Sequence, residues 1–160
     1  EESLFRGAAR TALATGVAVS IRYGADALHD LDIVLDEKLP ADRVVVGGLD
    51  RADAHAAGAA LAIARRGAYV ALDHVGTADD AHLADDERAT LVRDLIDAGH
   101  GDRILLSSNA TGVSKGEPGR EVPFSHILST FVPLLTARGI GDPDIARILT
   151  DNPRALLSLR

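Results

Sequence analysis

Short apolar runs alternate with longer amphipathic stretches along most of the chain. Four runs are short and rich in branched apolar residues, as buried strands are, and they span 17–21, 43–48, 68–74 and 103–107. Apolar positions recur at helical spacing in the stretches between them, which span 2–14, 25–39, 51–66 and 85–98. Strand–helix units in series build parallel sheets, so the pattern predicts an α/β fold made of the (β/α) units of a TIM-type barrel.

The last third of the chain breaks this rhythm. A loop rich in glycine is predicted over 111–122, and a long apolar helix over 124–138 should be kinked or split by Pro133. Asp142-Pro143 should start a short helix over 142–149, and Asp151-Asn152-Pro153 should cap a last one that ends near 159. The sequence therefore predicts four strands and a helical C-terminal segment.

Composition narrows the class of protein. A length of 160 residues with 46% hydrophobic residues favours a single domain over 1–160. The net charge of −7 and the lack of any basic run argue against nucleic acid as a partner. No apolar run reaches the roughly 18 residues of a membrane span, and no cysteine is present. We therefore expect a cytoplasmic protein without disulfides, thiolate metal sites or a membrane partner.

Polar residues stand where the predicted strands end. Arg22 follows the first strand, Asp50 the second, the pair Asp73-His74 ends the third, and Asn109 follows the fourth. In parallel barrels the catalytic residues lie at this end of the strands. One interpretation is that His74, Asp73 and Asp50 act there as acid or base. Arg22 would bind a carboxylate or phosphate in this interpretation, with Asn109 beside it as a second substrate-binding residue. The other interpretation is that Arg22 forms an ion pair with Asp73 or Asp50 in a disused pocket.

Four segments carry a resemblance to a known family. They are Val45-Val46-Gly47-Gly48-Leu49-Asp50, Leu72-Asp73-His74, the run 103–109 and the closing run 148–154. In order and spacing they resemble the C-terminal half of the phosphotriesterase family of metal-dependent hydrolases, which belongs to the amidohydrolase superfamily and includes lactonases. The resemblance implies strands five to eight of a TIM-type barrel, that is, a half-barrel.

The resemblance also implies where metal ligands should stand. The family pattern has histidines at the positions of Arg22 and Gly48, and an aspartate at the position of Asn109. A guanidinium stays protonated and repels a cation, and glycine has no side chain to offer. We therefore expect no metal ligand and no cofactor in this chain, with zinc or another divalent metal present only if the family site survives.

Half a barrel would expose two sheet edges and an apolar concave face. The expected partner is accordingly a second copy of the chain, in a homodimer, or a separate N-terminal half-barrel. The function predicted is a phosphotriesterase-like protein that has diverged from metal-dependent ester or lactone hydrolysis and binds a small anion at the barrel mouth. One alternative is an active hydrolase of the phosphotriesterase or lactonase type whose metals are held mainly by an N-terminal half. Another is a non-enzymatic, self-associating barrel module.

Overall fold

The computed structural model describes residues 2–24, 26–77, 79–108 and 122–159. The four strands form one parallel sheet in the order β1 (Val19–Arg22), β2 (Val44–Gly47), β3 (Tyr69–Leu72) and β4 (Ile104–Leu106). In register, Arg22 lies opposite Gly47, and Leu72 lies opposite Leu106. The predicted α/β fold with four parallel strands is confirmed, and the arrangement is that of part of a TIM-type barrel.

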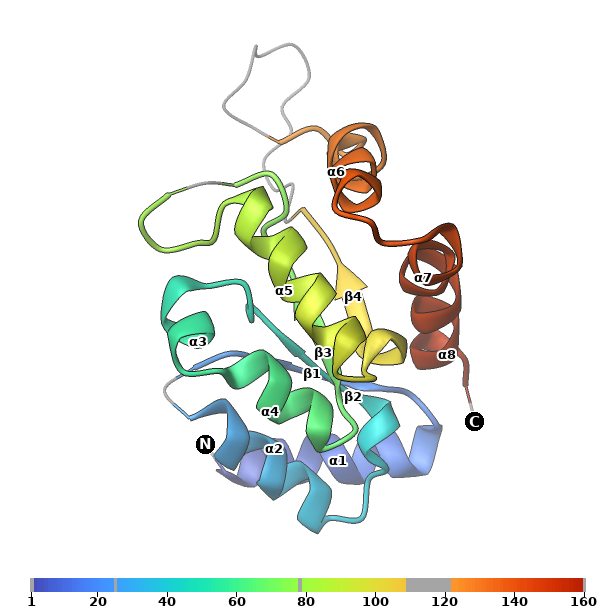
Figure 1. Cartoon of the computed structure of the whole chain (residues 1–160). Coiled ribbons are helices and arrows are strands. Elements are labelled where there is room, and N and C mark those ends of the chain that lie inside the picture. Colours follow the sequence, from blue (N-terminus) through green and yellow to red (C-terminus); the bar gives the residue numbers. More distant parts are fainter. Residues whose placement is uncertain (1, 25, 78, 109–121, 160) are drawn as a thin grey trace, which may run out of the picture.

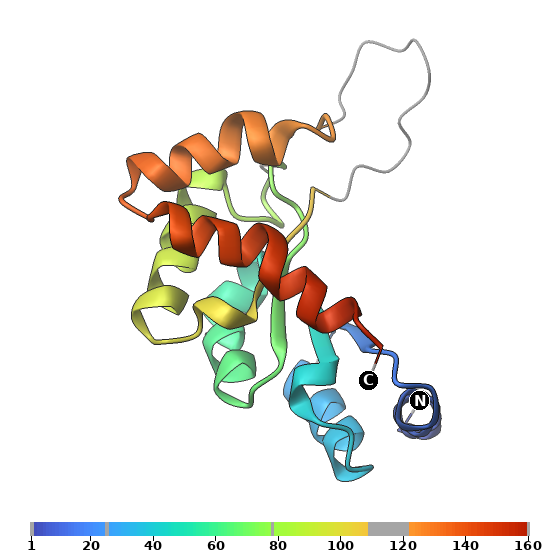
Figure 2. The same cartoon turned by 90° about the vertical axis from the view of Figure 1, so that its right-hand side faces the viewer.

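The helices of the described ranges connect the strands and continue after them. They are α1 (Glu2–Thr15), α2 (Ala27–Asp36), α3 (Ala52–Ala56), α4 (Ala59–Arg65), α5 (Asp85–Asp97), α6 (Val132–Ala137), α7 (Asp142–Ala146) and α8 (Asn152–Leu157). Figures 1 and 2 show α2, α4 and α5 on one face of the sheet, whereas α8 packs against the other face. Within these ranges no helix is both long and apolar enough to cross a bilayer.

The two faces of the sheet differ in burial. Most side chains that point toward the helices are buried, among them Ile21, Val46 and Leu72. On the opposite, concave face Ser20 is exposed and Leu105 is half-buried. There the sheet and α8 line a pocket of about 290 Å³. The concave face is therefore only partly covered, as the interior of an incomplete barrel would be.

The helix predicted over 51–66 is two helices in the structure. Gly58 separates α3 from α4 in the left-handed conformation, with φ of +65°. Glycine adopts this conformation without the penalty that a Cβ brings, so the chain can turn between two alanine-rich helices. Periodicity alone cannot detect such a break, because the apolar positions continue on both sides of it.

The prediction of two separate C-terminal helices is also wrong. Residues 142–157 do not form two separately capped helices. A π-helical turn over Arg147–Asp151 joins α7 to α8, and Asp151 keeps right-handed helical backbone angles instead of acting as a cap. A proline cannot donate the helical hydrogen bond, and the wider turn directly before Pro153 accommodates that loss.

The same device occurs around Pro133. A π-helical turn over Ile127–Phe131 precedes α6, whose first turn contains this proline. The helix is not split at Pro133, because His126, Phe131 and Val132 all keep right-handed helical backbone angles and the π-helical turn runs directly into α6. The loop predicted over 111–122 lies outside the described residues, except for its last residue.

The end of the chain is held to the sheet by a buried side chain. Asn152, at the start of α8, donates hydrogen bonds from Nδ2 to the carbonyl oxygens of Gly101 at 2.9 Å and Ile104 at 2.8 Å. Gly101 begins the 3-10 turn before β4, and Ile104 is the first residue of β4. The amide therefore fixes α8 against the start of the last strand.

Candidate functional site

Asp50 is a fully buried carboxylate just beyond the carboxyl end of β2. Its Oδ1 accepts a hydrogen bond from the backbone N–H of Asp73 at 3.2 Å and contacts Nδ1 of His74 at 2.9 Å. Its Oδ2 accepts from the backbone N–H of His74 and from Nε of Arg88, both at 2.8 Å. Asp50 therefore fixes the backbone at the end of β3 and the imidazole that follows it.

Arg88 extends this contact to α5 and to the segment before α6. Its side chain is fully buried, and Nη1 donates to the carbonyl oxygen of Thr77 and to Oδ1 of Asp85, each at 2.8 Å. Within the described ranges Nη2 of Arg88 has no hydrogen-bond partner. Oδ2 of Asp85 lies 2.8 Å from Nε2 of His126. We call Asp50, His74, Arg88, Asp85 and His126 the Asp50 cluster.

Both carboxylates of this cluster are stabilised in their charged form. Burial would raise the pKa of Asp50, but the hydrogen bonds from His74 and Arg88 outweigh it and lower that pKa. Burial acts in the same direction on Asp85, where bonds from His126, the Gly76 backbone and Arg88 lower the pKa. At neutral pH the cluster therefore holds two carboxylate charges against the buried guanidinium.

His74 is oriented by this charge. Because the Asp50 carboxylate is ionised, Nδ1 of His74 carries the proton of their hydrogen bond. Whenever the ring is neutral, Nε2 therefore keeps its lone pair and can accept a proton or a hydrogen bond. The ring is only 6% exposed, and its centroid lies 4.0 Å from that of the His82 ring.

Asp73 occupies the space beside Gly47, the last residue of β2. Its Oδ2 accepts a hydrogen bond from the backbone N–H of Gly48 at 2.7 Å, and its Oδ1 accepts from Oγ of Ser107 at 3.2 Å. A Cβ on Gly47 would lie 2.4 Å from Oδ2 of Asp73. Gly47 is therefore required for the carboxylate to reach the Gly48 amide.

Arg22 ends β1 with an exposed side chain. Among the described residues it forms no ion pair, because Asp50 is bonded to His74 and Arg88, and Asp73 to Gly48 and Ser107. The interpretation in which Arg22 neutralises Asp73 or Asp50 is therefore wrong. Asn109, predicted to bind substrate, lies outside the described residues.

The structure thus brings three predicted site residues together, Asp50, Asp73 and His74. Sequence reasoning missed Arg88. Its signal was present in the helical spacing, because Arg88 stands three, four and seven residues before Leu91, Val92 and Leu95, which are buried. An arginine on the core-facing side of a helix needs a buried acceptor, and Asp50 is that acceptor.

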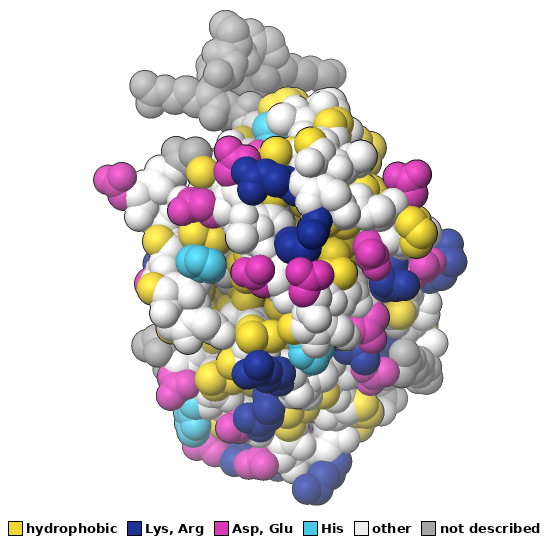
Figure 3. Space-filling view, viewed as in Figure 1, with side chains coloured by type: hydrophobic (Ala, Val, Ile, Leu, Met, Phe, Trp, Pro, Cys, Tyr) yellow, Lys and Arg dark blue, Asp and Glu magenta, His cyan; other side chains and the backbone are white. Residues whose placement is uncertain are grey.

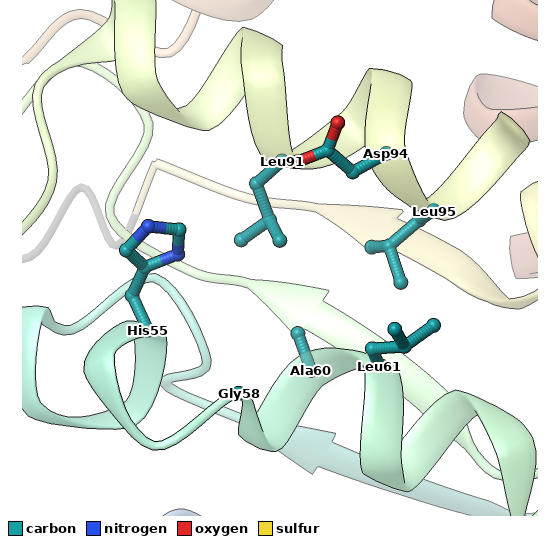
Figure 4. Close-up of a pocket in the computed structure, with 7 residues that line it drawn as sticks. All are labelled: His55, Gly58, Ala60, Leu61, Leu91, Asp94 and Leu95. Carbon is teal, nitrogen blue, oxygen red and sulfur yellow. The ribbon is translucent and has the colours of Figure 1, made fainter. Parts of the chain in front are cut away.

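Two further pockets lie on the surface. One, of about 410 Å³, is at the carboxyl ends of β1 and β2 and is lined by Tyr23, Gly24, Arg51 and Asp53. The other, of about 170 Å³, lies between α4 and α5, with Ala60, Leu61, Leu91 and Leu95 as its apolar lining and His55 and Asp94 at its rim (Figure 4). This outer pocket contains none of the predicted site residues.

Charge is not concentrated over these features. On the face shown in Figure 3, basic and acidic side chains are interspersed, and hydrophobic side chains show between α4 and α5. Among the described residues, this face offers no basic patch that could bind a polyanion. That agrees with the sequence, whose net charge is −7 and which has no basic run.

Residues 1–157 match the sequence pattern of the Phosphotriesterase family. The chain belongs to this family. A Phosphotriesterase homology protein of Escherichia coli is 28% identical, and the match covers 96% of this chain and 52% of that protein. An N-acetyltaurine hydrolase of Dictyostelium discoideum is 29% identical over 91% of this chain and 42% of its own length.

Solved structures of the phosphotriesterase family give the same result. The E. coli Phosphotriesterase homology protein, crystallised with phosphate in its active site, superposes with a TM-score of 0.82 at 28% identity, over 95% of this chain and 52% of its own. A resiniferatoxin-binding protein of Rhodobacter sphaeroides gives the same TM-score at 26% identity, over 99% and 48%. The chain spans about half the length of these relatives.

Two of the described residues differ from the ligand types that the resemblance places at the metal site of the phosphotriesterase family. Arg22 offers a cation where the resemblance places a histidine, and Gly48 has no side chain and a φ of +74° that disfavours one. Over the ranges that the structure describes, no group of three or more His, Cys, Asp or Glu side chains is placed to hold a metal ion. The carboxylates of Asp50 and Asp73 accept other hydrogen bonds, from Arg88 and from the Gly48 backbone.

Proposed function

We propose that this phosphotriesterase-family chain has lost the metal-dependent ester or lactone hydrolysis of its relatives and binds a small anion at the carboxyl end of its sheet. Arg22 is the observation that carries the proposal. It is an exposed guanidinium at the end of β1, without an ion pair among the described residues, at a position where the resemblance places a metal-binding histidine. A permanent cation here attracts an anion and repels a metal ion.

The remaining groups suit an anion that carries a proton. The Asp50 carboxylate holds the imidazole of His74 by Nδ1, which leaves Nε2 as the basic atom of the ring. Asp73 directly precedes His74, at the end of β3. His74 would exchange a proton with the ligand, and Asp50 would set the tautomer without touching the ligand, because Asp50 is fully buried. The phosphate in the active site of the E. coli homologue supports this end of the sheet as an anion site.

The test is phosphate-dependent stabilisation of the whole chain. Inorganic phosphate should raise the melting temperature of the parent, and Arg22→Ala should abolish the rise. Arg65→Ala is the matched control, because Arg65 is also exposed but lies at the end of α4, before β3 begins. Equal stabilisation of the parent and of Arg22→Ala would show that Arg22 is not the anion site.

A second candidate is an active hydrolase whose metals are held mainly by an N-terminal half. It is favoured by the relatives, which are named hydrolases or phosphotriesterase homology proteins and are about twice as long as this chain. Metal analysis of the purified protein separates the two candidates. About two zinc-like ions per completed barrel would support the hydrolase, whereas a metal-free protein that still binds phosphate would support the first proposal.

A third candidate is a barrel module that functions by association, with a second copy or with a separate N-terminal half-barrel as its partner. The partly covered concave face favours it. Leu157 of α8, which helps to line the pocket there, is 74% exposed, and β1 and β4 are the outer strands of the sheet. Sedimentation velocity distinguishes a completed barrel from a monomer.

A further inference from the structure

The pocket at the carboxyl ends of β1 and β2 combines a guanidinium with a phenol. Its lining residues, Tyr23, Gly24, Arg51 and Asp53, come from the segment after β1 and from the start of α3. The volume of about 410 Å³ falls within the usual range for small-molecule sites. The pocket lies on the same edge of the sheet as Arg22 but is lined by other side chains.

A side chain at position 48 would contact two of the residues that line this pocket. A Cβ on Gly48 would lie 3.6 Å from Cβ of Tyr23 and 3.7 Å from Cδ of Arg51, so a side chain at this position would project between the two. The φ of +74° also disfavours any residue other than glycine. Glycine at this position, where the family pattern has a metal-ligating histidine, therefore leaves Tyr23 and Arg51 without a side chain of residue 48 between them.

The guanidinium of Arg51 is held by one ion pair and has one nitrogen that can still donate to a ligand. Its Nε and Nη2 donate to the carboxylate of Asp53 at 3.0 and 3.1 Å. In the part of the chain that the structure describes, Nη1 of Arg51 has no acceptor. The pKa of Arg51 is raised, chiefly by the hydrogen bond to Asp53, and Tyr23 adds a smaller electrostatic contribution in the same direction. Tyr23 and Arg51 line the same pocket, so one small ligand bound there can meet both side chains.

We propose that this pocket is an oxyanion subsite for a small ligand with a flat body, in which Arg51 and the Tyr23 hydroxyl bind a phosphate or carboxylate group and the Tyr23 ring packs against that body. Asp53 is the internal competitor for the guanidinium. Their ion pair is exposed, with 37% and 58% of the two side chains accessible, so a ligand can share or displace it readily. This subsite rests on the proposed function in one respect, namely that small anions bind at this end of the sheet. It does not depend on Arg22 as the residue that binds them.

The experiment titrates the full chain with phenyl phosphate, benzoate and inorganic phosphate, followed by NMR chemical shifts. We expect phenyl phosphate or benzoate to bind more tightly than inorganic phosphate, because only these offer a ring to Tyr23. Arg51→Gln should weaken binding at least tenfold, and Tyr23→Phe should weaken it severalfold while preserving the ring contact. Asp53→Asn should strengthen binding, because it frees Arg51. A merely structural role of Arg51 would not produce this gain.

Arg65→Gln is the control, and circular dichroism checks that each variant is folded. If Arg51→Gln binds as tightly as the parent while Arg22→Ala does not, the Arg51 subsite is wrong and the proposed function stands. If Arg51→Gln loses binding and Arg22→Ala keeps it, the subsite stands and the role of Arg22 is wrong. If the parent binds none of the three probes, both proposals are wrong.

Discussion

At the scale of single residues, the site depends on the contact of Asp73 with Gly47, the last residue of β2, and Gly48, which follows it. The double-mutant cycle of Gly47→Ala and Asp73→Ala tests this contact. The alanine Cβ would lie 2.4 Å from Oδ2 of Asp73, so the carboxylate must leave the Gly48 amide. We expect Gly47→Ala to lower the free energy of unfolding by about 1–3 kcal/mol in the parent and by much less in the Asp73→Ala background.

Urea unfolding followed by circular dichroism measures all four corners of this cycle. Gly24→Ala is the control, because a Cβ there meets nothing within 4 Å. Equal losses in both backgrounds would show that Asp73 does not confine Gly47.

The sequence allowed part of this site to be predicted. Asp50, Asp73 and His74 meet because parallel strands end at the same edge of a sheet, which the strand pattern implied. The bond between Asp50 and Arg88 was not predicted, since it joins residues 38 positions apart through the placement of α5. Arg22 does not pair with Asp50 for the same reason, because the carboxylate oxygens of Asp50 already accept hydrogen bonds from Arg88 and His74.

At the scale of elements, the break between α3 and α4 is set by the backbone of Gly58. We expect Gly58→Ala to destabilise the protein by about 1 kcal/mol, although a Cβ there would meet nothing within 4 Å, because its φ is +65°. Gly7→Ala is the matched control. Gly7 also lies in open space but in the helical backbone of α1, so alanine should stabilise the protein by up to about 1 kcal/mol.

Thermal or urea unfolding of both variants decides this prediction. A stabilising Gly58→Ala would mean that α3 and α4 can join into the single helix that the periodicity predicted. The contrast also shows why strand and helix positions were predictable whereas the breaks were not. Apolar spacing records which side faces the core, but a left-handed residue or a π-helical turn leaves that spacing almost unchanged.

The Asp50 cluster joins β2, β3, α5 and the segment before α6, and it predicts how these elements respond to acid. The pKa values of Asp50 and Asp85 are lowered in the folded protein. Their stabilising contribution is therefore fully present above the pKa of an unfolded aspartate, about 4, and is lost as pH falls through the lower folded values. We expect the free energy of unfolding to fall steeply below about pH 4.

Asp50→Asn tests this assignment. The variant should be less stable at pH 7 by about 3 kcal/mol, since a buried guanidinium loses a partner, and its loss of stability in acid should be shallower than that of the parent. Asp94→Asn, an exposed change on α5, should leave the pH profile unchanged. Parallel profiles for the parent and Asp50→Asn would remove Asp50 as a source of acid sensitivity.

At the scale of the whole molecule, the four strands of the described ranges form part of a TIM-type barrel, and the concave face of their sheet is only partly covered. Ser20 and Arg22 are exposed on that face, Val45 and Leu105 are half-buried, and α8 covers part of it. A second copy placed across this face would cover the apolar surface and pair the outer strands β1 and β4. The sequence indicated this exposure by predicting four strands where a closed barrel has eight, but it left the identity of the partner open.

We therefore expect the purified chain to sediment as a species larger than its 16.7 kDa monomer. Leu105→Glu should shift it to the monomer while circular dichroism remains that of a folded α/β protein, because a charge on the concave face cannot be buried without a counter-ion. Leu128→Glu is the matched control, since Leu128 is 65% exposed and does not line the concave pocket. If the parent sediments as a single 16.7 kDa species, self-association is excluded and the separate half-barrel remains the candidate partner.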